Sequence, residues 1–116
     1  MSLDLSADEA ALQARAGEIA TGVIAPRAAA VDRSEQYPFD NVQTLKDAGF
    51  VGMTIPRQYG GQGRSFLDAV LVIEQMAKAC TVTGRIVVET NMGAVSTVMA
   101  YGNQGQKKLA ADMVLA

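Results

Sequence analysis

Arg85 and Glu89 are the residues of this sequence whose types and spacing indicate chemistry. They are four residues apart, so they share one face of a helix. A guanidinium near the start of an otherwise apolar helix needs an anion, because burying it unpaired is costly. The anion is either Glu89, in an ion pair worth about 0.3–0.5 kcal/mol, or an anionic group at the far end of a ligand, held by two parallel hydrogen bonds.

Composition excludes other kinds of site. The 116 residues include no His and one cysteine, Cys80, which rules out His-based triads, His metal sites, disulfides and Cys-rich zinc sites. A net charge of −2 with scattered basic residues provides no nucleic-acid surface.

Residues 1–9 are acidic where a targeting peptide is basic, and no apolar run approaches the ~20 residues that span a bilayer. We therefore expect a single domain in a reducing compartment, the cytoplasm, with Cys80 as a buried thiol.

The sequence predicts an all-α fold of about five helices. Four of them begin with a small polar residue that can cap a free backbone N–H group, followed three residues later by an acid or amide. These pairs are Ser6 with Glu9, Asp40 with Gln43, Ser65 with Asp68, and Asn103 with Gln106.

Proline and glycine mark the bends and ends of the first two helices. The first is expected to kink or break at Pro26 and to continue to about residue 31. The second ends at Gly49, which suits a left-handed cap. Residues 50–56 are predicted to be extended. Residues 59–63 are predicted to form a turn and not a phosphate loop, because they lack the Gly-Lys-Ser/Thr ending.

Apolar residues at spacings of three and four predict three further helices. Residues 65–79 carry a wide apolar face that we expect to be almost fully buried, made of Phe66, Leu67, Val70, Leu71, Ile73 and Ala77. Residues 82–100 are predicted to be one buried helix; their β-branched residues leave a strand as the alternative. The last helix covers residues 103–115, with Leu109 and Met113 facing inward.

These apolar faces exceed what five short helices can cover among themselves, and residues 113–116 end the chain without polar side chains. We therefore expect the chain to be the front piece of a longer protein. The alternative is a last helix docked on its own domain.

Six segments carry a family resemblance. They are Ile-Ala-Pro-Arg-Ala at 24–28, Tyr-Pro-Phe at 37–39, Ala-Gly-Phe-Val-Gly-Met at 48–53, Ile-Pro-Arg-Gln-Tyr-Gly-Gly-Gln-Gly at 55–63, Val-Ile-Glu-Gln-Met-Ala at 72–77 and Tyr-Gly-Asn-Gln-Gly-Gln-Lys at 101–107. Together they resemble the N-terminal helical domain of acyl-CoA dehydrogenases, in order and spacing, over nearly the whole chain.

The resemblance implies a flavoprotein, usually a homotetramer, in which a middle β domain and a C-terminal helical domain follow residues 1–116. It implies that FAD lies between those two domains and that an electron-transferring flavoprotein reoxidises it. The catalytic Glu of the family comes from the C-terminal domain, so we reject Glu89 as the base. We expect residues 1–116 alone to be inactive and not to hold FAD tightly.

The resemblance also implies that the third and fourth helices close one wall of the acyl pocket. We therefore expect Arg85, Glu89, Met92 and Gly93 to contact the acyl-CoA substrate. Glutaryl-CoA dehydrogenases likewise carry an Arg near the start of this helix. A closer likeness, to the branch that contains 3-sulfinopropanoyl-CoA desulfinases, rests on residues 35–38, 40–42, 76–80, 84–86 and 109–112.

The sequence thus predicts the N-terminal domain of a FAD-dependent acyl-CoA dehydrogenase, an oxidoreductase that introduces an α,β double bond into an acyl-CoA. One alternative is a desulfinase of the same fold acting on 3-sulfinopropanoyl-CoA. The alternative from another class is a free-standing, non-catalytic helical interaction module.

Overall fold

The computed structural model describes residues 4–116, so the first three residues of the acidic N-terminal stretch lie outside the described residues. The elements are α1 (Ala7–Ile19), the π-helical turn η1 (Ala20–Ile24), α2 (Ala25–Ser34), α3 (Phe39–Asp47), the 3₁₀ turn η2 (Arg57–Tyr59), α4 (Phe66–Ala79), α5 (Thr81–Asn91), α6 (Ala94–Tyr101) and α7 (Gln104–Leu115). No strand occurs among them, which confirms the predicted all-α fold. No described helix is long and apolar enough to cross a bilayer.

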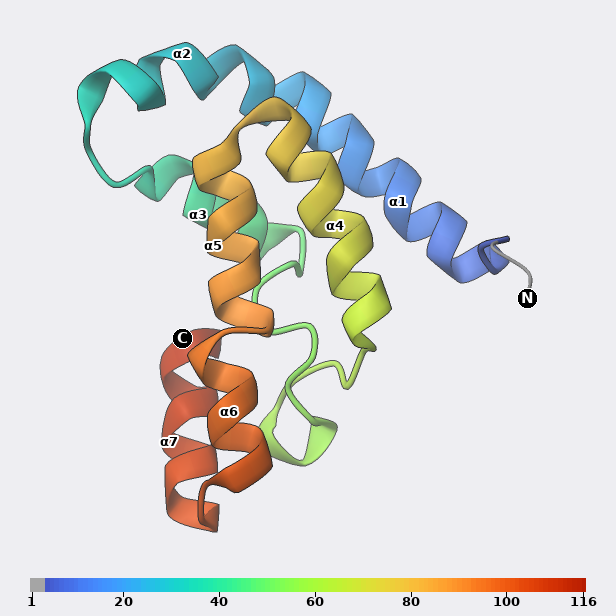
Figure 1. The fold of residues 1–116 in the computed structure, drawn as a ribbon, viewed down its shortest axis with the longest axis vertical. Helices are drawn as coiled ribbons and strands as arrows, with labels where there is room; N and C mark the ends of the chain where they lie inside the picture. The colour runs from blue at the N-terminus through green and yellow to red at the C-terminus, as the bar shows by residue number, and fades with distance from the viewer. Residues whose placement is uncertain (1–3) are drawn as a thin grey trace.

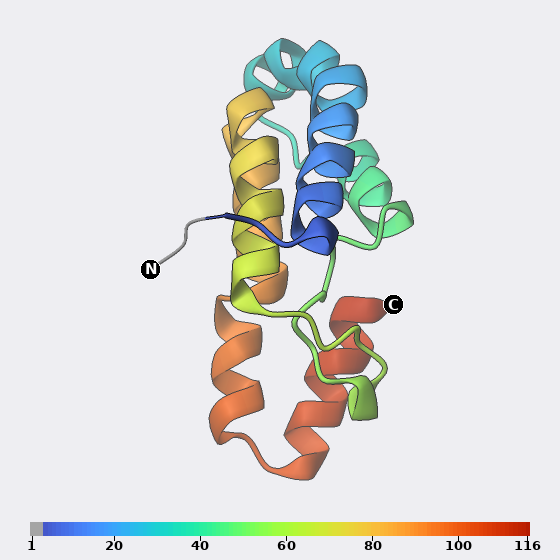
Figure 2. The ribbon, with the colours of Figure 1, turned by 90° about the vertical axis from the view of Figure 1, so that its right-hand side faces the viewer.

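The helix α4 is the centre of the fold, because it packs between α1 and α5 (Figure 1). The elements α1, η1 and α2 follow one another as a long bent rod, and α3 packs against α5. The helices α6 and α7 form a separate antiparallel pair below α5 (Figure 2). The molecule is therefore flat, with extents of 41 × 39 × 22 Å.

Proline changes the hydrogen-bonding pattern of the first predicted helix but does not end the helix. A capping box at Ser6 and Glu9 starts it, as predicted. Ahead of Pro26 the helix widens into η1, where the Ala25 N–H donates to the Ala20 carbonyl five residues back. This wider turn makes room for a proline ring that lacks an N–H donor. The helix then continues through α2 to Ser34, further than predicted.

The second predicted helix, α3, starts earlier than predicted, and the segment after it is not extended. Asp40 is not its cap: α3 already begins at Phe39, and Asp40 lies in the first turn, where a negative charge favours the helix dipole. Gly49 has the predicted positive φ, 76°. Residues 50–56 are not extended but form a series of bends, in which the Ile55 N–H donates to the carbonyl of Gly52. These bends turn several apolar side chains into the core.

The predicted buried face of α4 was wrong for several of its residues. Ser65 caps the helix through the Asp68 N–H, as predicted. However, Phe66, Leu67 and Val70 are 53%, 49% and 44% exposed. Leu71 is buried as predicted and Ile73 is partly buried. The other buried apolar residues of α4, which the prediction did not include in this face, are Ala69, Val72 and Met76. Cys80, directly after α4, is a buried free thiol, as expected.

The predicted single helix over residues 82–100 is two helices, α5 and α6. It is interrupted at Met92 and Gly93, where Gly93 adopts a non-helical ψ of −124°. The last helix, α7, has the capping box predicted at Asn103. Its inward face was predicted wrongly: Leu109 and Met113 are 62% and 72% exposed, whereas the small residue Ala111 is fully buried. Ala111 allows α7 to approach its neighbours more closely than a larger side chain would.

Candidate functional site

An apolar groove runs along the outer face of α5. It has a volume of about 400 Å³ and is lined by Tyr37, Thr81, Val82, Arg85, Ile86, Glu89 and Thr90. Tyr37 reaches it from the segment between α2 and α3, and the other residues belong to α5. Two of the four predicted substrate-contacting residues, Arg85 and Glu89, thus lie in one groove.

Arg85 and Glu89 form the ion pair that their spacing predicts. Arg85 Nε donates to Glu89 Oε1 over 2.6 Å, and Nη2 contacts the same oxygen. The side chains are 73% and 47% exposed, so this guanidinium is not buried in the described residues. Because both contacts use one oxygen, the pair is not the two-oxygen fork in which guanidinium binds carboxylate most strongly. An exposed pair of this kind is weak.

Met92 and Gly93 lie just beyond the groove, at the break between α5 and α6. Met92 is partly buried. A Cβ at Gly93 would lie 2.6 Å from Glu89 Oε2, so the absence of a side chain there leaves space for the Glu89 carboxylate. Gly93 therefore shapes the surroundings of Glu89, whereas the structure does not place Met92 on the groove.

Both ends of α5 are fixed by buried amides that the sequence did not single out. At the first turn, Asn41 Nδ2 donates to Thr83 Oγ1 over 2.9 Å. At the last residue, Asn91 Nδ2 donates to the Phe50 carbonyl over 2.9 Å and Asn91 Oδ1 accepts from the Thr54 N–H. Asn41 and Asn91 are 1% and 0% exposed. Nothing in the sequence distinguishes these two asparagines from exposed polar residues, since Asn41 lies among the polar residues of α3.

The glycine-rich loop has a structural role. Arg64 beside it pairs with Asp8 at 3.1 Å and Asp68 at 3.3 Å, so two carboxylates already balance its charge. A Cβ at Gly61 would overlap the backbone carbonyl of Ile55, so close packing requires this glycine. This geometry is that of the turn expected from the sequence.

The comparison with known families settles which fold family this is. Residues 6–113 match the family described as acyl-CoA dehydrogenase, N-terminal domain. The chain belongs to this family. The predicted family and domain are thereby confirmed.

Relatives in this family are named for different enzymatic activities. A 3-sulfinopropanoyl-CoA desulfinase of Variovorax paradoxus is 56% identical over 113 residues, which are 97% of this chain and 28% of the relative. A short-chain specific acyl-CoA dehydrogenase of Clostridium acetobutylicum is 27% identical, over 93% of this chain and 28% of the relative. The chain therefore spans only about 28% of the length of these relatives.

A solved structure supports the fold. It is described as an electron transferring flavoprotein of Acidaminococcus fermentans and superposes with a TM-score of 0.88 at 24% identity, covering 99% of this chain and 30% of that chain. At this identity the likeness establishes the arrangement of the helices alone.

Proposed function

We propose that residues 1–116 are the N-terminal domain of a longer enzyme that breaks the C–S bond of 3-sulfinopropanoyl-CoA with one water molecule, so that carbon gains hydrogen and the products are propanoyl-CoA and sulfite. The observation that carries this proposal is that the chain is far more similar in sequence to desulfinases than to its other relatives, over nearly the same residues. Four desulfinases are 56%, 51%, 55% and 52% identical to the chain. Its acyl-CoA dehydrogenase and acryloyl-CoA reductase relatives are 27%, 30%, 28% and 26% identical.

The groove on α5 supports the same substrate class. Its lining is mainly apolar, which suits a short methylene chain, and its charges are concentrated at Arg85 and Glu89. In the proposal, Arg85 exchanges the single oxygen of Glu89 for both oxygens of the sulfinate. Glu89 then serves as the resting partner that holds Arg85 in the groove when no ligand is bound.

The rest of the proposed enzyme follows from the family resemblance. The middle β domain and the C-terminal helical domain would bind FAD between them, outside this chain, and the enzyme would be a cytoplasmic homotetramer. The 116-residue chain would close one wall of the acyl pocket and would be inactive alone. If the enzyme is instead an acyl-CoA dehydrogenase, an electron-transferring flavoprotein would be its electron acceptor.

The direct test is product analysis with the full-length protein. It is incubated with 3-sulfinopropanoyl-CoA, and released sulfite and propanoyl-CoA are quantified. In parallel it is incubated with butanoyl-CoA and an artificial electron acceptor, and the α,β-unsaturated product is measured. We expect sulfite release in the first reaction and little oxidation in the second. Oxidation of butanoyl-CoA without sulfite release would establish the dehydrogenase alternative.

A further inference from the structure

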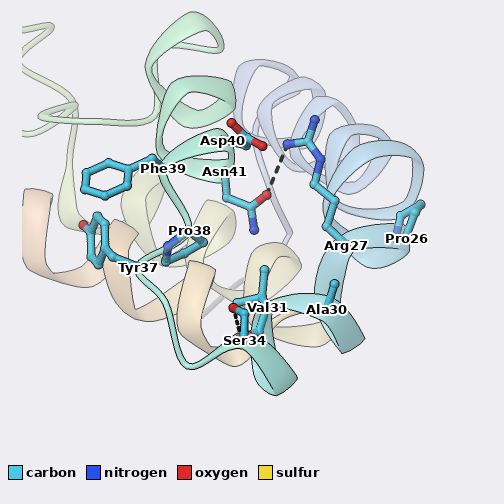
Figure 3. Close-up of a pocket in the computed structure, with 10 residues that line it drawn as sticks. All are labelled: Pro26, Arg27, Ala30, Val31, Ser34, Tyr37, Pro38, Phe39, Asp40 and Asn41. Atoms are coloured by element: carbon cyan, nitrogen blue, oxygen red, sulfur yellow. Dashed lines mark hydrogen bonds between the residues drawn. The ribbon is translucent and has the colours of Figure 1, made fainter.

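A chain of hydrogen bonds connects three helices beneath the groove. On α2, Arg27 Nη1 donates to Asn41 Oδ1 over 3.2 Å, and Asn41 lies on α3. The Asn41 amide donates in turn to the Thr83 hydroxyl on α5. Figure 3 shows Arg27 and Asn41 facing one another across the hollow between α2 and α3. Because Arg27 engages the amide oxygen, the amide nitrogen is directed at Thr83.

Thr83 is well placed to set the orientation of α5. It lies in the first turn of the helix and is fully buried. The N-cap residue, Cys80, makes no side-chain capping bond, so the cap does not fix this turn. Thr83 is two residues before Arg85, and positions two apart lie on roughly opposite sides of a helix. Together with the close approach of Gly84 to Ala77 on α4, the buried contact of Thr83 therefore helps to set the direction in which Arg85 projects.

We propose that Asn41 and Thr83 are positioning residues that hold Arg85 at the orientation needed to bind the distal anion of an acyl-CoA. This inference rests on the proposed function, because it acts through the anion-binding role of Arg85. If the Thr83 hydroxyl is removed, the buried Asn41 amide loses its acceptor and the first turn of α5 loses its connection to α3. Arg85 then samples more orientations, and binding of the anion weakens.

The test compares two ligands that differ at the far end of the acyl chain. Succinyl-CoA carries a terminal carboxylate, and butanoyl-CoA has the same number of acyl carbons without it. Dissociation constants are measured by titration calorimetry with the full-length protein. The key variant is Thr83→Val, which keeps the shape of the side chain without the hydroxyl. Thr83→Ser restores the hydroxyl, and Thr21→Val makes the same change at an exposed position.

We expect Thr83→Val to weaken succinyl-CoA binding about three- to tenfold, the effect of one lost hydrogen bond, and to leave butanoyl-CoA binding unchanged. Thr83→Ser and Thr21→Val should bind both ligands as the parent does. Equal weakening for both ligands, or no change for either, would overturn the positioning role. If Thr83→Val does not fold, Thr83→Ala takes its place. If this variant also fails to fold while Thr83→Ser is stable, the contact is structural only and the proposal is overturned.

Combining Thr83→Val with Arg85→Ala distinguishes a failure of the positioning role of Thr83 from a failure of the anion-binding role of Arg85. If the two residues act together, adding Thr83→Val to Arg85→Ala weakens succinyl-CoA binding no further. A further loss in the double variant would mean that Thr83 acts independently of Arg85. If Arg85→Ala itself binds succinyl-CoA as the parent does, the anion-binding role of Arg85 fails. If Arg85→Ala loses that binding and Thr83→Val keeps it, only the positioning role fails.

Discussion

Gly84 on α5 packs directly against Ala77 on α4. A Cβ at position 84 would lie 2.8 Å from the Ala77 Cβ and 2.9 Å from its backbone nitrogen. The two helices are connected through Cys80 alone, so they have little freedom to separate. This approach, together with the Thr83 contact, fixes α5 against the centre of the fold.

We expect Gly84→Ala to destabilise the protein. Overpacking costs about 1–3 kcal/mol in a close contact, and the better helix propensity of alanine offsets roughly 1 kcal/mol at most. The control is Gly22→Ala, because a Cβ there would meet nothing within 4 Å. Denaturant unfolding of the full-length protein measures both variants. Equal or greater stability for Gly84→Ala would show that α4 and α5 are not held as closely as described.

Removing the charge of Glu89 should favour anionic ligands. Glu89→Gln leaves Arg85 without its resting carboxylate, and an exposed pair of this spacing is worth about 0.3–0.5 kcal/mol. We therefore expect the full-length variant to bind succinyl-CoA about twofold more tightly, as measured by calorimetry. Asp112→Asn, which breaks a similar exposed pair with Lys108 on α7, is the matched control. Weaker binding by Glu89→Gln would mean that Glu89 itself contacts the ligand favourably.

The isolated 116-residue chain should self-associate. Large apolar side chains are exposed on several elements, among them Phe39, Phe66, Tyr101, Leu109 and Met113. Tyr101, Leu109 and Met113 line one hollow between α6 and α7, and a contiguous exposed apolar surface of this kind marks a site that other protein covers. Sedimentation velocity over a range of concentrations measures the association. A well-behaved monomer at all concentrations would favour the free-standing interaction module over a domain of a longer enzyme.

Local interactions were the part of the structure that the sequence predicted well. The caps at Ser6, Ser65 and Asn103 and the pair of Arg85 with Glu89 connect residues three or four positions apart, so spacing alone indicates them. Asp40 is the exception among the caps. The helix had already begun at Phe39, after Pro38, whose fixed φ ends the preceding loop.

Contacts between distant segments were not predictable in this way. The Asn41 amide meets Thr83 42 residues later, and nothing in the spacing of these residues indicates the contact. The buried face of α4 was misjudged for a related reason. Phe66 and Val70 are as apolar as Leu71 and Val72, so periodicity alone did not determine which side α1 and α5 would cover.

The central claim is that Arg85 recognises a distal anion on the acyl chain, and Arg85→Ala in the full-length protein tests it most directly. The variant and a Lys108→Ala control are compared for binding of succinyl-CoA and butanoyl-CoA and for sulfite release from 3-sulfinopropanoyl-CoA. We predict that Arg85→Ala loses about tenfold in succinyl-CoA affinity and in kcat/KM for sulfite release, the lower end of the range for hydrogen bonds to a charged group because Arg85 is 73% exposed. Butanoyl-CoA binding should stay unchanged. Equal losses for the charged and uncharged ligands, or no loss for either, would contradict the account.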